Sequence, residues 1–154
     1  MQYQHERDGE RARTRTRLLV VDDDPNCRAL LDAIFDMYGY EVATTDTVFG
    51  ASALLASFKP DVVLLDLMLP YRSGASWLSE LRAQPETVSL PVVVLSGLPE
   101  VLPRDRRRLA TAVVRKPFRT LALVDTVRRA LLQTAPVHTV ATNGLASIQP
   151  LGSL

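Results

Sequence analysis

The sequence has few of the residues that build disulfides, zinc–thiolate sites or histidine-based active sites. Among 154 residues there is one cysteine, Cys27, and there are two histidines, His5 and His138. A single cysteine excludes an intramolecular disulfide and a cysteine-based zinc site, and such scarcity is typical of the reducing cytoplasm. Both histidines lie in terminal segments of tail-like composition. The composition therefore argues against histidine-based catalysis or metal binding.

Long apolar runs and an excess of one charge are also missing. No apolar run reaches the roughly 18 residues of a membrane span, because Asp66 interrupts the longest one. The N-terminus is polar and contains no segment of signal-peptide type. Eighteen basic and 17 acidic residues give a net charge of +1, which provides no reason to expect nucleic acid or membrane as the main partner. We expect a cytoplasmic protein with no membrane insertion and no direct nucleic-acid contact.

Two terminal segments differ in composition from the rest of the chain. Residues 1–17 contain five arginines, three acidic residues and almost nothing apolar, which predicts a disordered basic arm. Residues 133–154 are uncharged apart from His138 and lack periodicity, which predicts a flexible tail. The segment between them, 18–132, is long enough for one domain with a single core.

Within 18–132, short apolar runs alternate with helical patterns. The predicted strands are 18–21, 40–44, 62–65, 91–95 and 112–115, and the predicted helices lie around 30–35 and at 48–58, 74–83, 98–110 and 121–132. Such alternation implies right-handed βαβ crossovers and a parallel sheet. Strands that are apolar at successive positions are buried on both faces. We therefore predict a three-layer α/β fold.

The residues that end the predicted strands carry reactive groups. Asp22 and Asp23 end the first strand, Asp66 the third, Ser96 the fourth and Lys116 the fifth. Ligands of open parallel sheets bind at the carboxyl ends of the strands, so we expect these side chains to share one edge. Lys116 is one of two lysines among 18 basic residues. This strand end therefore carries a compact ammonium in a chain that otherwise uses the planar guanidinium of arginine, and the two are not interchangeable.

Three carboxylates at one edge repel each other unless a cation joins them, and their oxygens suit Mg²⁺. A hydroxyl from Ser96 and the ammonium of Lys116 would neutralise and bind a phosphoryl group. Asp66 would then be the nucleophile that forms an acyl phosphate. The pattern predicts magnesium-dependent phosphoryl transfer to Asp66.

Four segments, LLVVDDDP, VVLLDLMLP, VVVLSG and VVRKPF, resemble the signature segments of response-regulator receiver domains of two-component signalling. The resemblance covers 18–132 and implies a flavodoxin-like (CheY-like) fold with strand order 2-1-3-4-5. It implies that Asp66 is the phosphoacceptor and that Ser96 and Lys116 contact the phosphoryl group. It also implies Mg²⁺ ligands from Asp22, Asp23, Asp66 and the backbone carbonyl of Met68. Gly74 matches the glycine of the loop that follows the acceptor.

By the same resemblance, the chain is expected to be a phosphoacceptor signalling domain rather than an enzyme with a separate substrate. The composition after residue 132 predicts no second ordered segment, so we expect this domain to be stand-alone. A sensor histidine kinase or a histidine phosphotransfer protein would supply the phosphoryl group. The output would be a protein contact, either with an unknown partner or in a homodimer through the fourth helix, fifth strand and fifth helix.

Three features depart from the family pattern or extend it. Val113 occupies a position that is usually aromatic, so the usual aromatic switch is absent or altered. Four arginines, Arg104 and 106–108, form either a docking patch for an acidic partner or a solvated helix face. Apolar Met68 and Leu98 are expected to limit attacking water, which predicts a long-lived phosphorylated form.

Two alternatives stay open. A phosphohydrolase of the haloacid dehalogenase type also has an Asp-x-Asp after its first strand, a strand-end Ser or Thr, and a lysine. In this chain Asp22 and Asp24, Ser96 and Lys116 would match these positions. This alternative leaves Asp66 without a role, and Asn26 departs from its first motif. A phosphorylation-independent pseudo-receiver is the second alternative, and the phosphorylated residue distinguishes all three.

Overall fold

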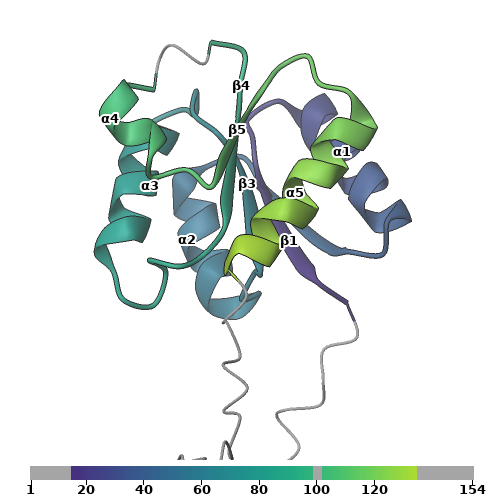
Figure 1. The fold of residues 1–154 in the computed structure, drawn as a ribbon, viewed down its shortest axis with the longest axis horizontal. Coiled ribbons are helices and arrows are strands. Elements are labelled where there is room, and N and C mark those ends of the chain that lie inside the picture. The colour runs from purple at the N-terminus through teal and green to yellow at the C-terminus, as the bar shows by residue number, and fades with distance from the viewer. Residues whose placement is uncertain (1–14, 99–101, 135–154) are drawn as a thin grey trace, which may run out of the picture.

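The computed structural model describes residues 15–98 and 102–134. The strands are β1 Arg17–Val21, β2 Glu41–Thr45, β3 Val62–Asp66, β4 Val92–Ser96 and β5 Ala112–Arg115. The helices are α1 Pro25–Met37, α2 Val48–Ser57, α3 Gly74–Ala83, α4 Arg104–Arg107 and α5 Thr120–Thr134. All neighbouring strands are parallel, in the order β2-β1-β3-β4-β5. The predicted three-layer fold and strand order are confirmed (Figure 1).

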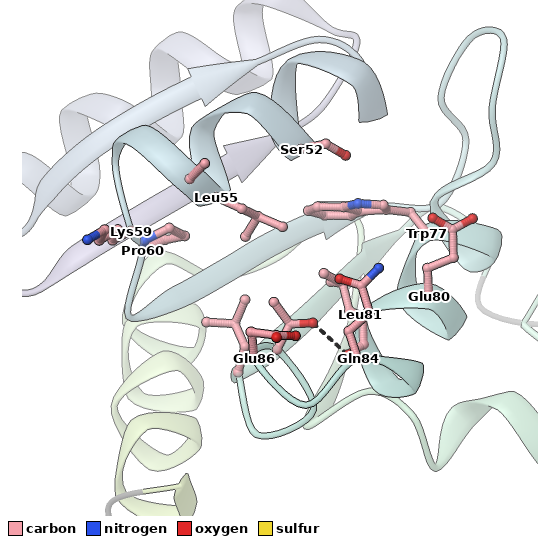
Figure 2. Close-up of a pocket in the computed structure, with 12 residues that line it drawn as sticks. Ser52, Leu55, Lys59, Pro60, Trp77, Glu80, Leu81, Gln84 and Glu86 are labelled. Atoms are coloured by element: carbon pink, nitrogen blue, oxygen red, sulfur yellow. Dashed lines mark hydrogen bonds between the residues drawn. The ribbon is translucent and has the colours of Figure 1, made fainter.

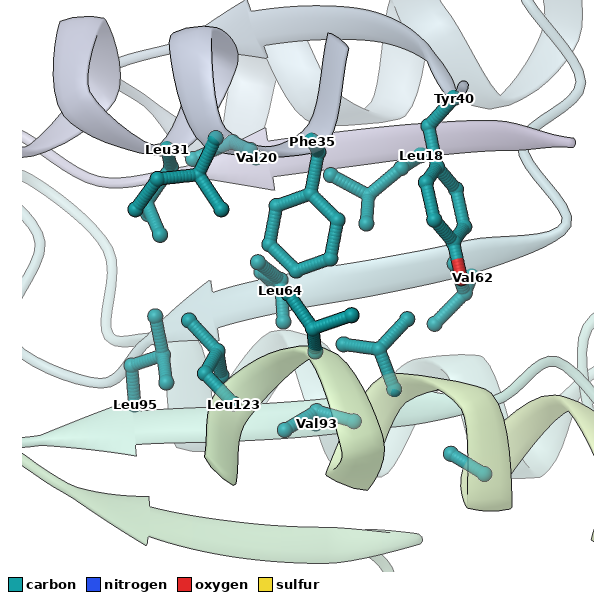
Figure 3. Packing of buried hydrophobic residues seen from close by; sticks show 14 residues of the cluster. Leu18, Val20, Leu31, Phe35, Tyr40, Val62, Leu64, Val93, Leu95 and Leu123 are labelled. Carbon is teal, nitrogen blue, oxygen red and sulfur yellow. The ribbon is translucent and has the colours of Figure 1, made fainter. Parts of the chain in front are cut away.

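The sheet has a hydrophobic layer on each face, because successive strand residues point to opposite sides. Leu18 and Val20 of β1 face α1 and α5, where Phe35 and Tyr40 pack edge to face with ring centroids 5.2 Å apart (Figure 3). Leu19 of β1 faces the other layer, in which Trp77 of α3 is almost fully buried. β3 and β4 are buried along their whole length, as expected for central strands of a parallel sheet.

The turn from β1 into α1 explains the acidic run that follows the first strand. Asp24 is the N-cap of α1, and its side chain accepts a hydrogen bond from the backbone N–H of Asn26 at 2.9 Å. Pro25 is the first helical residue, where its missing N–H costs nothing. Asp24 is thereby used as a cap, while Asp22 and Asp23 remain available at the edge of the sheet.

The predicted helix at 98–110 is wrong in its extent. Among the described residues of this segment, α4 covers Arg104–Arg107 alone. Pro103 stands at the N-cap, because proline has no N–H for a helical hydrogen bond and its ring clashes with the preceding turn. The chain leaves the helix at Arg108, and the Leu109 and Ala110 N–H groups bond carbonyls three residues back in a closing turn.

Both ends of the folded region differ slightly from the predicted boundaries. Residues 15–17, assigned to the arm, are ordered: Arg15 bonds Asp36 at 2.7 Å, and Arg17 begins β1 and pairs with Glu41 at 3.1 Å. At the other end, α5 continues to Thr134, two residues past the predicted limit. The rest of the predicted arm and tail, with His5 and His138, lies outside the described residues.

Candidate functional site

Asp22 lies at the carboxyl end of β1 in an almost fully buried position, with 1% of its surface exposed. Its backbone N–H donates to the Thr45 carbonyl at 3.1 Å and extends the β1–β2 ladder by one residue. Its carboxylate accepts from the Asp24 N–H at 2.9 Å and from the Lys116 ammonium at 2.6 Å. The neighbouring Asp23 is exposed. The same turn therefore presents one buried and one exposed carboxylate.

Asp66 ends β3, next to β1 in the sheet, and is 7% exposed. One carboxylate oxygen accepts from the Met68 N–H at 3.0 Å, and the other lies 3.4 Å from the Lys116 ammonium. Gly74 packs against the following loop so closely that a Cβ there would overlap the Asp66 carbonyl oxygen. Glycine at this position lets α3 begin directly beside the strand end.

Ser96 and Lys116 come from the two strands on the other side of β3. Ser96 ends β4, is fully buried, and its hydroxyl oxygen accepts from the Leu98 N–H at 3.2 Å. Lys116 follows β5, and its backbone N–H donates to the Ser96 carbonyl at 2.9 Å. This backbone bond holds the lysine at the edge of the sheet, from which its side chain reaches both Asp22 and Asp66.

The predicted strand-end residues are therefore brought together. Carboxylate oxygens of Asp22, Asp23 and Asp66 lie within 4.8 Å of one another. No contact joins the Ser96 hydroxyl to Asp66 among the described residues, so Ser96 borders the acidic cluster without bonding it. Val113 faces the side of the sheet opposite α5, because its neighbour Val114 packs in the layer of α5 and alternate residues face opposite sides.

For both Asp66 and Lys116, burial and neighbouring charges shift the pKa in opposite directions. Burial raises the pKa of Asp66, and the Met68 N–H and the charge of Lys116 only partly compensate. For Lys116, burial by itself lowers the pKa, but the Asp22 hydrogen bond and the charge of Asp66 outweigh it and raise the pKa. The ammonium is thus held charged beside two buried carboxylates.

The first turn of α1 supplies two further neighbours that the motif analysis did not place in the site. The Arg28 guanidinium donates to the Asp22 carbonyl at 2.7 Å and holds the β1–α1 turn. Burial and the adjacent Asp22 raise the pKa of Cys27 to about 12, so its thiol is not a nucleophile at neutral pH. In the sequence, only their position in the first turn after the strand end indicates that they are near the site. That position does not predict toward which residue either side chain points.

The donor set fits Mg²⁺, which prefers a few carboxylate oxygens with room for water and a phosphate oxygen. Three carboxylates face one ammonium, so the cluster carries an excess of negative charge. The burial of Asp22 and Asp66 makes that excess costly. A divalent cation would neutralise this excess.

A separate cavity of about 570 Å³ lies at the opposite end of the sheet, between α2 and α3 (Figure 2). Lys59 and Pro60, before β3, and Leu90, before β4, border it, together with Trp77 and Glu80 of α3. It has no residue in common with the acidic cluster.

No helix among residues 15–98 and 102–134 is long and apolar enough to cross a membrane.

Comparison with known proteins gives a consistent result. The family model of the response regulator receiver domain matches residues 18–128. Protein Rrf1 of Nitratidesulfovibrio vulgaris is 36% identical over 118 residues, which cover 75% of this chain and 82% of Rrf1. The phosphate regulon transcriptional regulatory protein PhoB of Pseudomonas aeruginosa is 31% identical over 124 residues, 77% of this chain and 53% of PhoB. The chain thus spans about half the length of PhoB.

Solved structures agree with these relatives. The response regulator protein TrrA from Thermotoga maritima, solved in complex with Mg²⁺-BeF, has a TM-score of 0.69 and 29% identity, covering 75% of this chain and 98% of that chain. A sensor protein from Polaromonas has a TM-score of 0.73 and 26% identity, covering 79% of this chain and 99% of that chain.

Proposed function

The chain belongs to the response regulator receiver domain family, and from this premise we propose that Asp66 accepts a phosphoryl group in a magnesium-dependent reaction. The observation that carries the proposal is the position of the Asp66 carboxylate. It lies 3.4 Å from the Lys116 ammonium and within 4.8 Å of the Asp22 and Asp23 carboxylate oxygens. A phosphoryl group on Asp66 would meet positive charge as soon as it formed.

Each surrounding residue has a distinct part in this proposal. An Asp66 oxygen forms the bond to phosphorus while the bond from phosphorus to the donor's nitrogen breaks. Lys116 moves from bonding carboxylates to pairing with the phosphoryl oxygens, and the Ser96 hydroxyl donates to one of them. Asp22, Asp23, Asp66 and the Met68 carbonyl would hold Mg²⁺, which supplies charge neutralisation at the transferred group.

The donor and the output follow from the family rather than from contacts of this chain. We propose a sensor histidine kinase or a histidine phosphotransfer protein as the donor. We also propose that 18–132 acts as a receiver in the cytoplasm and that its output is a protein contact. In this scheme the chain is a phosphoacceptor and not an enzyme with a separate substrate.

Intact-mass measurement after incubation with acetyl phosphate and MgCl₂ tests the proposal. We expect the mass of one phosphoryl group to be added to the wild type and to the control Asp46→Asn, whose carboxylate is exposed outside the site. Asp66→Asn should show no addition. If Asp22→Asn removes the label while Asp66→Asn keeps it, the phosphohydrolase alternative is correct. No addition to the wild type under any condition supports the pseudo-receiver.

A further inference from the structure

The helix α2 differs from the other helices of the described chain in having no charged residue. Its sequence, VFGASALLAS, consists of apolar residues, one glycine and two serines, whereas α1, α3, α4 and α5 each contain both acidic and basic residues. A surface helix presents charged or polar side chains to water, and a helix that is apolar on all sides is typically buried. In α2 the side chains of Phe49, Ala53 and Ala56 are exposed instead. The composition of α2 is therefore that of a helix with a cover on its outer side.

The cavity of about 570 Å³ lies where the second half of α2 no longer closes against α3. The buried residues of α2, Val48 and Ala51, are both in its first half, while Leu55 is only partly buried. Leu55 and Trp77 of α3 border the cavity from its two sides (Figure 2). Binding sites in proteins have volumes of about 300–1,000 Å³, so the cavity has room for several side chains of a bound segment.

The end of α5 lies at the same edge of the sheet as this cavity. Leu131 of α5 and Asp61 border one shallow hollow, and Asp61 directly follows Pro60, which borders the cavity. The helix ends three residues after Leu131, about 4.5 Å further along its axis. Residues 135–144 can span up to about 33 Å. The segment that follows them, 145–154, is therefore attached within reach of the cavity.

The composition of the two chain ends shows which of them suits the cavity. Residues 135–154 contain no Asp, Glu, Lys or Arg, and their second half, LASIQPLGSL, has aliphatic side chains at Leu145, Ile148 and Leu151. Residues 1–14 contain three arginines and three acidic residues, and the burial of such charges is costly. An uncharged aliphatic segment matches both the apolar walls of the cavity and the uncharged surface of α2.

We propose that residues 145–154 bind in the cavity between α2 and α3 of their own domain, with their aliphatic side chains against Leu55 and Trp77. The exposed side chains of Gln84 and Glu86 border the cavity, and their oxygens accept hydrogen bonds from the backbone N–H groups of the segment. A short tether gives an effective concentration of the order of 1 mM, so weak contacts are sufficient. Any other ligand of this face has to displace the segment.

NMR of the full chain tests this proposal, because Trp77 is the only tryptophan of the sequence and its indole N–H gives one signal. In the wild type we expect nuclear Overhauser effects between the Trp77 ring and methyl groups of Leu145, Ile148 or Leu151. The variant Leu145→Asp, Ile148→Asp, Leu151→Asp should lose them and shift the indole signal, because carboxylates resist transfer to an apolar cavity. The control Thr139→Asp, Thr142→Asp, Asn143→Asp adds the same charge nearer to α5 and should keep both. Thermal unfolding checks that both variants fold.

A synthetic peptide of residues 145–154 provides a second measurement. It should shift the indole signal of the Leu145, Ile148, Leu151 variant at a concentration at least about threefold lower than that needed for the wild type, where the tethered segment competes. Equal titrations of the two proteins overturn the proposal, as does the absence of the ring-to-methyl effects in the wild type. Effects that arise only between isotope-labelled and unlabelled chains, with a dimer in sedimentation, also overturn it, because the segment then binds a second copy.

Discussion

Arg115 and Lys116 are consecutive residues, yet they belong to two regions that treat charge in opposite ways. Lys116 points into the acidic cluster, where its side chain is 24% exposed and contacts carboxylates from β1 and β3. Arg115 points to the surface and has no ion pair among the described residues. A buried charge needs a partner of opposite charge within the protein, and in the acidic cluster Lys116 is that partner for Asp22 and Asp66. An exposed charge stays hydrated, so Arg115 needs no partner within the chain.

Removing the charge of Lys116 is the strongest test of this contrast. We expect Lys116→Met to lower the free energy of unfolding by about 3 kcal/mol in the absence of divalent cations, because Asp22 and Asp66 are left buried without a cation. Urea unfolding with and without MgCl₂ measures it, and Mg²⁺ should recover part of the loss.

Arg115→Met is the matched control for that substitution. The same change one residue earlier should stay within about 0.5 kcal/mol of the wild type, since it removes an exposed charge. Lys116→Arg should fall between the two, because it keeps the charge but not the compact shape. Equal effects at positions 115 and 116 would contradict the distinction between the two regions.

The segment before α4 contains one buried side chain, Leu102, which is 1% exposed and packs in the layer of α2 and α3. Leu102→Ala should cost about 2–3 kcal/mol, because it leaves a cavity. Leu98→Ala, at a position that is 57% exposed, should cost less than about 0.5 kcal/mol. Urea unfolding distinguishes them, and similar values would show that Leu102 does not anchor the segment before α4.

These two regions also differ in how far the sequence predicts them. Strand ends in a parallel sheet meet at one edge, so the apolar runs before Asp22 and Asp66 were enough to predict their proximity. The same rule predicted Lys116 at that edge, whereas its contacts with both carboxylates are a finding of the structure. No local pattern specified that α4 would end at Arg107, because apolar Leu109 and Ala110 continue a helical pattern but pack as a turn. The exposure of Val113 depends on that tertiary outcome.

A smaller effect concerns the cost of ionising Asp66 in the absence of metal. Burial raises its pKa, so the ionised form is less stable in the folded protein than in the unfolded chain. Asp66→Asn removes that penalty and should raise the Tm in metal-free buffer. Since about 1 kcal/mol corresponds to about 4 °C for a domain of this size, we expect a rise of a few degrees by calorimetry.

The pH dependence of this gain has a defined sign. A raised carboxyl pKa means that the folded state binds the proton more tightly, so the penalty is complete above the folded pKa. It disappears as the pH falls below the ordinary value of 3.8. The Tm difference between Asp66→Asn and wild type should therefore shrink on acidification, whereas Asp46→Asn should show no such gain. A difference that grows at low pH would contradict the assignment.

The smallest expected effect concerns the two apolar side chains that flank the site, Met68 and Leu98. Both are 57% exposed, and their backbone N–H groups bond Asp66 and Ser96. They cover the site only partly, so Met68→Gln with Leu98→Gln should shorten the half-life of the phosphorylated form about threefold, under 1 kcal/mol in the barrier. Loss of label in intact-mass time courses measures it, with exposed Val88→Gln as control. An unchanged half-life means that these side chains do not limit the attack of water on the acyl phosphate.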